Sequence, residues 1–159
     1  MNKFSEIYST LFFIGYIKWA PGTIASIVSL VLIFLLDDYL VNNFTFIFIF
    51  FILFFLSLIS IHIYSKNIKN HDSKEIVIDE FLGIYIVLIF INNFNFLDNI
   101  NIYFKLLIIL ILFRFFDILK PYPISWIDRN IKNSFGVLFD DIIAGIYTII
   151  AISILNAFI

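Results

Sequence analysis

Cysteine is absent from the chain of 159 residues, and charged residues make up only 14% of it. The lack of cysteine excludes disulfides, thiolate metal ligands and a cysteine nucleophile. The low charged fraction argues against an ordinary soluble surface, because about a quarter of the residues in a typical soluble domain are charged. The formal net charge is −2, so the chain lacks the excess of Lys and Arg that is typical of proteins that bind nucleic acid. A membrane protein is the class that remains.

Hydrophobic residues make up 62% of the chain, and the mean hydropathy is +1.05. The apolar residues form segments at 23–36, 44–64, 81–97, 102–119 and 138–158. A helix needs about 20 residues to cross a hydrocarbon core of roughly 30 Å. The first segment is short, and asparagines interrupt the third, so both five spans and four spans fit the pattern. We predict an all-α membrane protein, with residues 1–159 forming a single domain that is a bundle of four to five transmembrane helices.

An amphipathic stretch precedes these segments. Phe4, Ile7, Leu11, Ile14 and Ile17 recur at helical spacing. This pattern predicts an N-terminal interfacial helix that continues through residue 17. A helix packed on the bundle is the alternative.

Basic residues are distributed unevenly about the predicted spans. If all five segments cross the membrane, only Lys105 of the ten Lys and Arg residues falls on the side of the 37–43 and 92–101 turns. The others lie on or near the opposite side: Lys3, Lys18, Lys66, Lys69, Lys74, Arg114, Lys120, Arg129 and Lys132. The positive-inside rule predicts that this opposite side faces the cytoplasm.

Acidic residues gather at the same predicted face. Asp79 and Glu80 begin the third segment, Asp117 lies near the end of the fourth, and Asp140 and Asp141 open the fifth. Acids at helix starts gain about 0.3–1 kcal/mol from the helix dipole, which is a purely structural alternative. Five carboxylates close together cannot all stay ionised without cations. Oxygen ligands without cysteine or clustered histidine suggest Mg²⁺ shared with a phosphate group.

Cations that suit a phosphate accompany these acids. Arg114 offers a planar donor fork, and Lys120 and Arg129 lie in the adjoining connection. An ion pair between Arg114 and Asp117, three residues apart, is the structural alternative and does not exclude a catalytic role.

Small and turn-forming residues mark the remaining features of this face. Thr23 and Ser26 follow a Pro-Gly turn and offer hydroxyls to an anion, although Ser and Thr also commonly cap helices. Pro121 is expected to stop the fourth helix. Gly83 and Gly145 are expected to permit close helix contact.

Several of these stretches together resemble the phosphatidylglycerophosphatase A family. The resemblance rests on Ala20–Ser26, Ile76–Gly83 and Phe113–Ile124, followed by Asp128-Arg129, Gly136 and Asp140–Gly145. These blocks cover the chain nearly end to end and appear in family order. One departure is Ala25, which stands where the family usually has glycine.

The resemblance implies a Mg²⁺-dependent enzyme that converts phosphatidylglycerophosphate to phosphatidylglycerol and inorganic phosphate. It implies a multi-pass protein of the bacterial cytoplasmic (inner) membrane whose active site faces the cytoplasm, with no obligatory protein partner. The expected catalytic residues are Asp79, Glu80, Arg114, Asp117, Asp140 and Asp141. Of these, the expected metal ligands are Asp79, Glu80, Asp140 and Asp141, and the expected substrate-binding residues are Thr23, Ser26, Lys120 and Arg129.

Three other functions compete with this one. A small membrane transporter with an intramembrane carboxylate relay is the main alternative, although a relay would place ionisable groups through the depth of the membrane. A structural subunit has no use for a dense acidic cluster. An alcohol-phosphatidyltransferase shares the substrate class and the metal, but its characteristic spacing of aspartates is absent.

Overall fold

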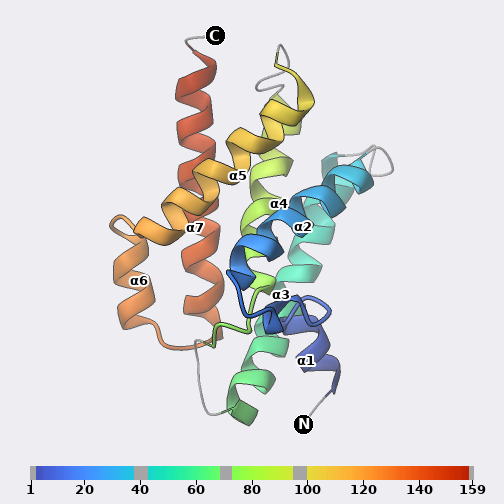
Figure 1. Cartoon of the computed structure of the whole chain (residues 1–159), viewed down its shortest axis with the longest axis vertical. Coiled ribbons are helices and arrows are strands. Elements are labelled where there is room, and N and C mark those ends of the chain that lie inside the picture. Colours follow the sequence, from blue (N-terminus) through green and yellow to red (C-terminus); the bar gives the residue numbers. More distant parts are fainter. Residues whose placement is uncertain (1–2, 38–42, 69–72, 95–99, 158–159) are drawn as a thin grey trace.

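Long apolar segments fold as helices because a helix satisfies its backbone N–H and C=O groups within one segment, without water. The computed structural model of the chain describes residues 3–37, 43–68, 73–94 and 100–157, and all regular structure within these ranges is helical. The elements are α1 (Lys3–Ser9), the 3₁₀ helix η1 (Ile14–Tyr16), α2 (Pro21–Asp37), α3 (Asn43–Ile68), α4 (Ile78–Phe94), α5 (Ile102–Leu119), α6 (Ile124–Asn130) and α7 (Ser134–Asn156). Figure 1 shows their arrangement.

The five predicted apolar segments correspond to α2, α3, α4, α5 and α7, so the predicted all-helical fold is confirmed. The fourth segment, α5, has the predicted bounds, because local interactions mark both of its ends. The Asn101 side chain accepts a hydrogen bond from the Tyr103 N–H at 3.0 Å, and the helix stops at Lys120, which has a φ of 44° and precedes Pro121. Two helical stretches, Phe44–Ile68 and Ser134–Asn156, are long and apolar enough to cross a membrane. The number of spans stays a prediction.

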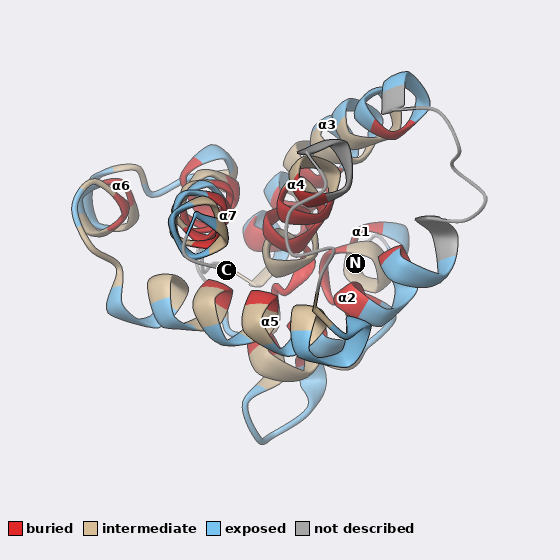
Figure 2. Cartoon of the chain, turned by 90° about the horizontal axis from the view of Figure 1, so that it is seen from above, coloured by how far each residue is buried: buried red, intermediate tan, exposed pale blue. Residues whose placement is uncertain are grey.

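Helix α4 lies at the centre of the bundle. It packs most extensively against α7, then against α2 and α3. Its residues Ile84, Val87 and Ile91 are completely buried. Seen from above, α4 is mostly buried and its neighbours surround it (Figure 2). The first turn of α4 therefore lies against several other helices.

The contact between α4 and α7 is close because glycines face each other. A Cβ atom added at Gly145 would lie 2.7 Å from the carbonyl oxygen of Gly83 and 2.8 Å from Ile86 Cγ2. A Cβ atom added at Gly83 would lie 2.8 Å from the carbonyl oxygen of Asp141. The prediction that these glycines permit close helix contact is confirmed.

The outer face of α3 is a stripe of exposed apolar side chains. Phe44, Phe48, Phe51, Phe55 and Ile59 recur at helical spacing and are at least 53% exposed. Apolar residues on α5 and α7 are also exposed, among them Phe104, Ile111 and Ile118 on α5 and Ile150 and Ile154 on α7. A soluble monomer rarely exposes a large continuous apolar surface, whereas lipid chains would cover this one. The surface thus supports association with a membrane.

The predicted continuous N-terminal helix is wrong. Helix α1 ends at Ser9, and Leu11, Phe12 and Phe13 adopt positive φ angles of 46°, 54° and 71° before η1 begins. At the end of α1 the Thr10 hydroxyl donates to the Glu6 carbonyl at 2.8 Å and accepts from the Phe13 N–H at 3.1 Å. Helix α1 packs against α3, as the alternative reading expected.

The sequence does not predict helix α6, because residues 124–130 lie in the connection between the fourth and fifth apolar segments. It is a short helix that packs against α7. Its inward residues Ile124 and Ile127 are buried, so tertiary packing stabilises a segment too short to be stable alone.

We expect Gly145→Ala to destabilise the protein. Alanine favours a helix over glycine by about 0.8–1.0 kcal/mol, but the close contact with Gly83 leaves no room for a methyl group, and overpacking costs about 1–3 kcal/mol. Thermal unfolding in detergent, followed by circular dichroism, should show a lower midpoint. The control is Ile146→Leu, on the exposed side of the same turn. An unchanged or higher midpoint for Gly145→Ala would show that the helices do not meet at this residue.

Candidate active site

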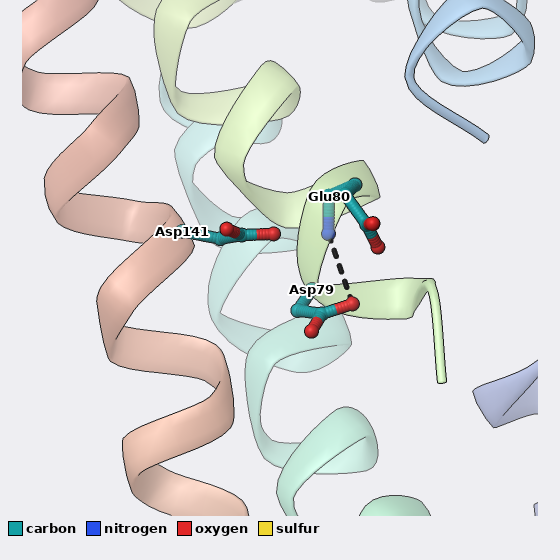
Figure 3. A group of neighbouring side chains, drawn as sticks. All are labelled: Asp79, Glu80 and Asp141. Carbon is teal, nitrogen blue, oxygen red and sulfur yellow. Dashed lines mark hydrogen bonds between the residues drawn. The ribbon is translucent and has the colours of Figure 1, made fainter. Parts of the chain in front are cut away.

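Three carboxylates from two helices converge at the start of α4. Asp79 and Glu80 belong to the first turn of α4, and Asp141 comes from α7. One oxygen from each of them can be chosen so that all three lie within 4.8 Å of one another. Figure 3 shows Asp141 reaching from α7 toward the first turn of α4, where the Glu80 N–H donates to Asp79 Oδ1 at 3.1 Å. We call these three residues the carboxylate cluster.

The glycine contact explains why the cluster forms. Gly83 lies four residues after Asp79, and Gly145 lies four residues after Asp141. Residues four apart lie on the same face of a helix, so the acids sit one turn from the point where the two backbones touch. Side chains as short as aspartate can meet across an interface only when the helices approach this closely.

Arg114 of α5 lies beside the cluster. Its Nη1 atom is 2.6 Å from Asp117 Oδ2 and 3.7 Å from Glu80 Oε1. The predicted pairing of Arg114 with Asp117 is therefore present, and the same guanidinium also faces the cluster. Within the described residues, Glu80 Oε2 and Arg114 Nε are buried and have no hydrogen-bond partner. Both atoms remain available to a ligand.

The start of α2 covers this arginine. A Cβ atom added at Gly22 would lie 2.1 Å from Glu80 Oε1 and 3.1 Å from Arg114 Nη1. A side chain at this position would displace the Glu80 carboxylate and the Arg114 guanidinium, so glycine leaves both groups in place. The sequence suggested a turn at Gly22 but gave no signal for this close approach.

Lys120 pairs with two acids that are not members of the carboxylate cluster. Its Nζ atom donates to Asp140 Oδ2 at 2.7 Å and to Asp128 Oδ1 at 2.8 Å. Burial alone would lower the pKa of the Lys120 ammonium, but the Asp140 and Asp128 carboxylates raise it above its ordinary value. Asp140 was predicted as a metal ligand, yet the structure places its carboxylate on Lys120. Lys120 was predicted to bind substrate, and the structure places it between two acids.

A cavity of about 750 Å³ joins these groups. Eleven of its lining residues are charged: Lys74, Asp79, Glu80, Arg114, Asp117, Lys120, Asp128, Arg129, Lys132, Asp140 and Asp141. Arg129 was expected at the site and lies there. Thr23 and Ser26 are not among the lining residues, and the Ser26 hydroxyl donates to the Gly22 carbonyl at 2.8 Å inside α2. Pro21 and Gly22, the first residues of α2, line the cavity in place of these hydroxyls.

Two features, one in the site and one outside the cavity, were missed from the sequence. Asp128 received no role, although its pairing with Lys120 fixes the connection around α6. A chain of hydrogen bonds was also missed: Tyr64 donates to Glu75 and contacts Tyr16 Oη at 3.2 Å, and Tyr16 donates to Glu6 at 2.8 Å. This chain links the N-terminal segment to the residues just before α4. Its members are far apart in sequence, so no local pattern predicts it.

Comparison with known proteins identifies one family. The family model for phosphatidylglycerophosphatase A matches residues 7–156. Phosphatidylglycerophosphatase A of Haemophilus influenzae is 43% identical over 82 residues, which are 52% of this chain and 46% of that protein. Phosphatidylglycerophosphatase A of Escherichia coli is 35% identical over 85 residues, which are 54% of this chain and 45% of that protein. The chain spans about half the length of these curated relatives in the alignments.

No solved structure matches the chain significantly. The family match nevertheless runs from α1 to the last residue of α7 and includes every helix that contributes to the carboxylate cluster. The chain therefore belongs to the phosphatidylglycerophosphatase A family.

Proposed function

We propose that the protein hydrolyses phosphatidylglycerophosphate to phosphatidylglycerol and inorganic phosphate, with Mg²⁺, at the cytoplasmic face of the bacterial inner membrane. The observation that carries this proposal is the carboxylate cluster with Arg114 beside it in one cavity. Acids for a metal and a cation for phosphate are the two requirements of metal-assisted phosphate ester hydrolysis. The two relatives, both phosphatidylglycerophosphatase A, support the choice of lipid.

The carboxylate cluster fits a magnesium ion. Mg²⁺ prefers oxygen ligands at 2.0–2.1 Å, so the ligands of one ion lie at most about 4.2 Å apart. The three oxygens lie within 4.8 Å of one another, which is close to this limit. The buried Glu80 Oε2 atom has no partner among the described residues, which is the state expected of a ligand atom. Asp79, Glu80 and Asp141 would hold the ion, which supplies a Lewis acid for the phosphoryl oxygens.

Arg114 would bind the phosphoryl group opposite these acids. Its planar fork can donate two parallel hydrogen bonds to phosphate oxygens, and Asp117 holds the guanidinium in place. A preorganised cation at this position stabilises the charge that develops on those oxygens in the transition state. Hydrolysis breaks the bond between phosphorus and the terminal glycerol oxygen. Water supplies the new oxygen on phosphorus, and a proton goes to the glycerol oxygen.

Lys120 has a supporting role in this scheme. Its ion pairs with Asp140 and Asp128 connect α7 to α6 and to the end of α5. They also neutralise Asp140, the acid adjacent to Asp141 in sequence. Without this pairing, a further negative charge would repel the phosphate of the substrate.

The topology proposal is that α2, α3, α4, α5 and α7 all cross the membrane. The N-terminal ends of α2, α4 and α7 and the C-terminal ends of α3 and α5 point toward the same end of the bundle (Figure 1). This alternation is what five consecutive crossings require. The charged cavity lies at that end, and the excess of basic residues there supports a cytoplasmic location. A carboxylate relay would instead need ionisable groups along the whole length of the helices.

Phosphate release is the direct test of the activity. The detergent-purified protein should release inorganic phosphate from phosphatidylglycerophosphate with Mg²⁺, and EDTA should stop the release, because the acids alone repel the substrate. No release with Mg²⁺ would contradict the proposed activity. Equal release with EDTA would contradict the role of the metal.

Asp79→Asn and Asp141→Asn should each lower kcat by about 100-fold or more, because each replaces a charged metal ligand with a neutral one. Both variants should remain membrane-inserted, with the circular dichroism spectrum of the unmodified protein. Glu6→Gln is the control, because it removes an acid outside the cavity and keeps an acceptor for Tyr16. Near-normal turnover by either aspartate variant would remove that residue from the metal site.

A reporter fused after Ile159 should lie outside the cytoplasm, because five crossings place the two ends of the chain on opposite sides. Alkaline phosphatase is active outside the cytoplasm, and green fluorescent protein fluoresces inside it, so the two fusions give opposite signals. The matched control is the same pair of reporters after Lys74, which should report the cytoplasmic side. A cytoplasmic signal after Ile159 would indicate four spans.

A further inference from the structure

The charges of the cavity divide into paired and unpaired groups. Arg114 pairs with Asp117 and Glu80, and Lys120 pairs with Asp140 and Asp128. Three lining cations form no ion pair with any carboxylate among the described residues: Lys74, Arg129 and Lys132. Lys74, Arg129 and Lys132 are all exposed. We call these three residues the mouth cations.

The mouth cations are separated from the carboxylate cluster along the bundle. Lys132 lies just before α7 begins at Ser134, whereas Asp141 lies inside that helix, about 10 Å further along at 1.5 Å per residue. Lys74 belongs to the connection that precedes α4, and Arg129 lies in the last turn of α6. The cavity therefore has unpaired acids inside and unpaired cations at its mouth.

The α6 side of the mouth has the character of a membrane interface. Trp126 on α6 is 51% exposed, and Tyr122 just before this helix is 77% exposed. Exposed tryptophan and tyrosine side chains typically lie at the depth of lipid headgroups. Arg129 follows Trp126 by three residues on the same helix, so it lies within one turn of that depth.

We propose that the mouth cations form a second anion subsite, which binds the phosphodiester of a lipid whose terminal phosphomonoester reaches the carboxylate cluster. This assignment rests on the proposed function. It defines the substrate class as phospholipids with a phosphodiester and a separate terminal phosphate. A lipid with one phosphomonoester attached directly to diacylglycerol fills only the inner part of the cavity. The carboxylate cluster and Arg114 can bind the phosphomonoester of either kind of lipid. The mouth cations therefore favour the lipid that also has a phosphodiester.

The physical basis is the different chemistry of the two phosphates. A phosphodiester needs positive charge and hydrogen-bond donors but no metal, which Arg129 and the two lysines supply. The terminal phosphomonoester carries more negative charge and would bind Arg114 and the magnesium ion at the carboxylate cluster. The mouth cations also attract anionic lipid from the membrane surface, and this attraction weakens with salt.

The test measures lipid binding separately from turnover. The protein is titrated in neutral detergent micelles with EDTA, and its tryptophan fluorescence follows binding of phosphatidylglycerophosphate or phosphatidic acid. The unmodified protein should bind phosphatidylglycerophosphate more tightly. In the Arg129→Gln/Lys132→Gln variant its affinity should fall about fivefold, and the preference over phosphatidic acid should shrink accordingly. Lys3→Gln/Lys66→Gln is the matched control, because it removes the same charge from residues that do not line the cavity.

The outcomes separate the two proposals. Equal affinity of the unmodified protein for both lipids, or an equal loss in the variant and its control, contradicts the second subsite even when phosphate release is normal. A preference that the variant loses, together with no phosphate release, supports the subsite and contradicts the activity. Inorganic phosphate is the soluble arm of the test. If equimolar phosphate displaces the lipid, the mouth cations bind a free anion and the proposed lipid subsite is wrong.

Discussion

The backbone contact between α4 and α7 determines the position of almost every group in the site. Gly83 and Gly145 let the two helices touch, and the acids one turn away then share one small volume. Helix α5 packs against the same pair and brings Arg114 to it, and Gly22 of α2 covers the arginine. If α4 and α7 were held apart by ordinary side chains, the carboxylate cluster would not exist. The packing of the bundle and the chemistry of its site therefore depend on one interaction.

Placing many charges in one cavity costs free energy unless the charges compensate one another. Cations of the chain compensate some of the acids in this cavity, and other acids have no such partner. Asp117, Asp128 and Asp140 each pair with a cation of the chain, whereas Asp79 and Asp141 have no basic partner within the described residues. These two acids, together with Glu80, form the carboxylate cluster within reach of a shared metal ion. The ion pairs fix the positions of the remaining groups, and the cluster keeps the negative charge that a divalent cation would balance.

Local patterns predicted the elements that local interactions determine. The apolar segments gave the main helices, and Pro121 marked the end of α5. The predicted site residues Asp79, Glu80, Asp141 and Arg114 do meet, although their catalytic roles stay predictions. What was missed depends on contacts between distant residues: the end of α1 at Ser9, whose carbonyl accepts from the Val77 N–H at 3.0 Å, and the pairing of Asp140 with Lys120 across 20 positions. Periodicity and spacing contain no information about such partners.

The apolar stripe on α3 has a consequence for how the protein meets a lipid. A protein covered by lipid chains diffuses in the same plane as its lipid ligands, so the frequency of encounter depends on the number of lipids per unit of membrane area. The concentration of lipid in the whole sample is then the wrong variable. Affinities and rates for this chain are meaningful as functions of the mole fraction of lipid in the bilayer or micelle. Diluting the ligand with neutral lipid or detergent would lower occupancy even when the total amount of ligand stays constant.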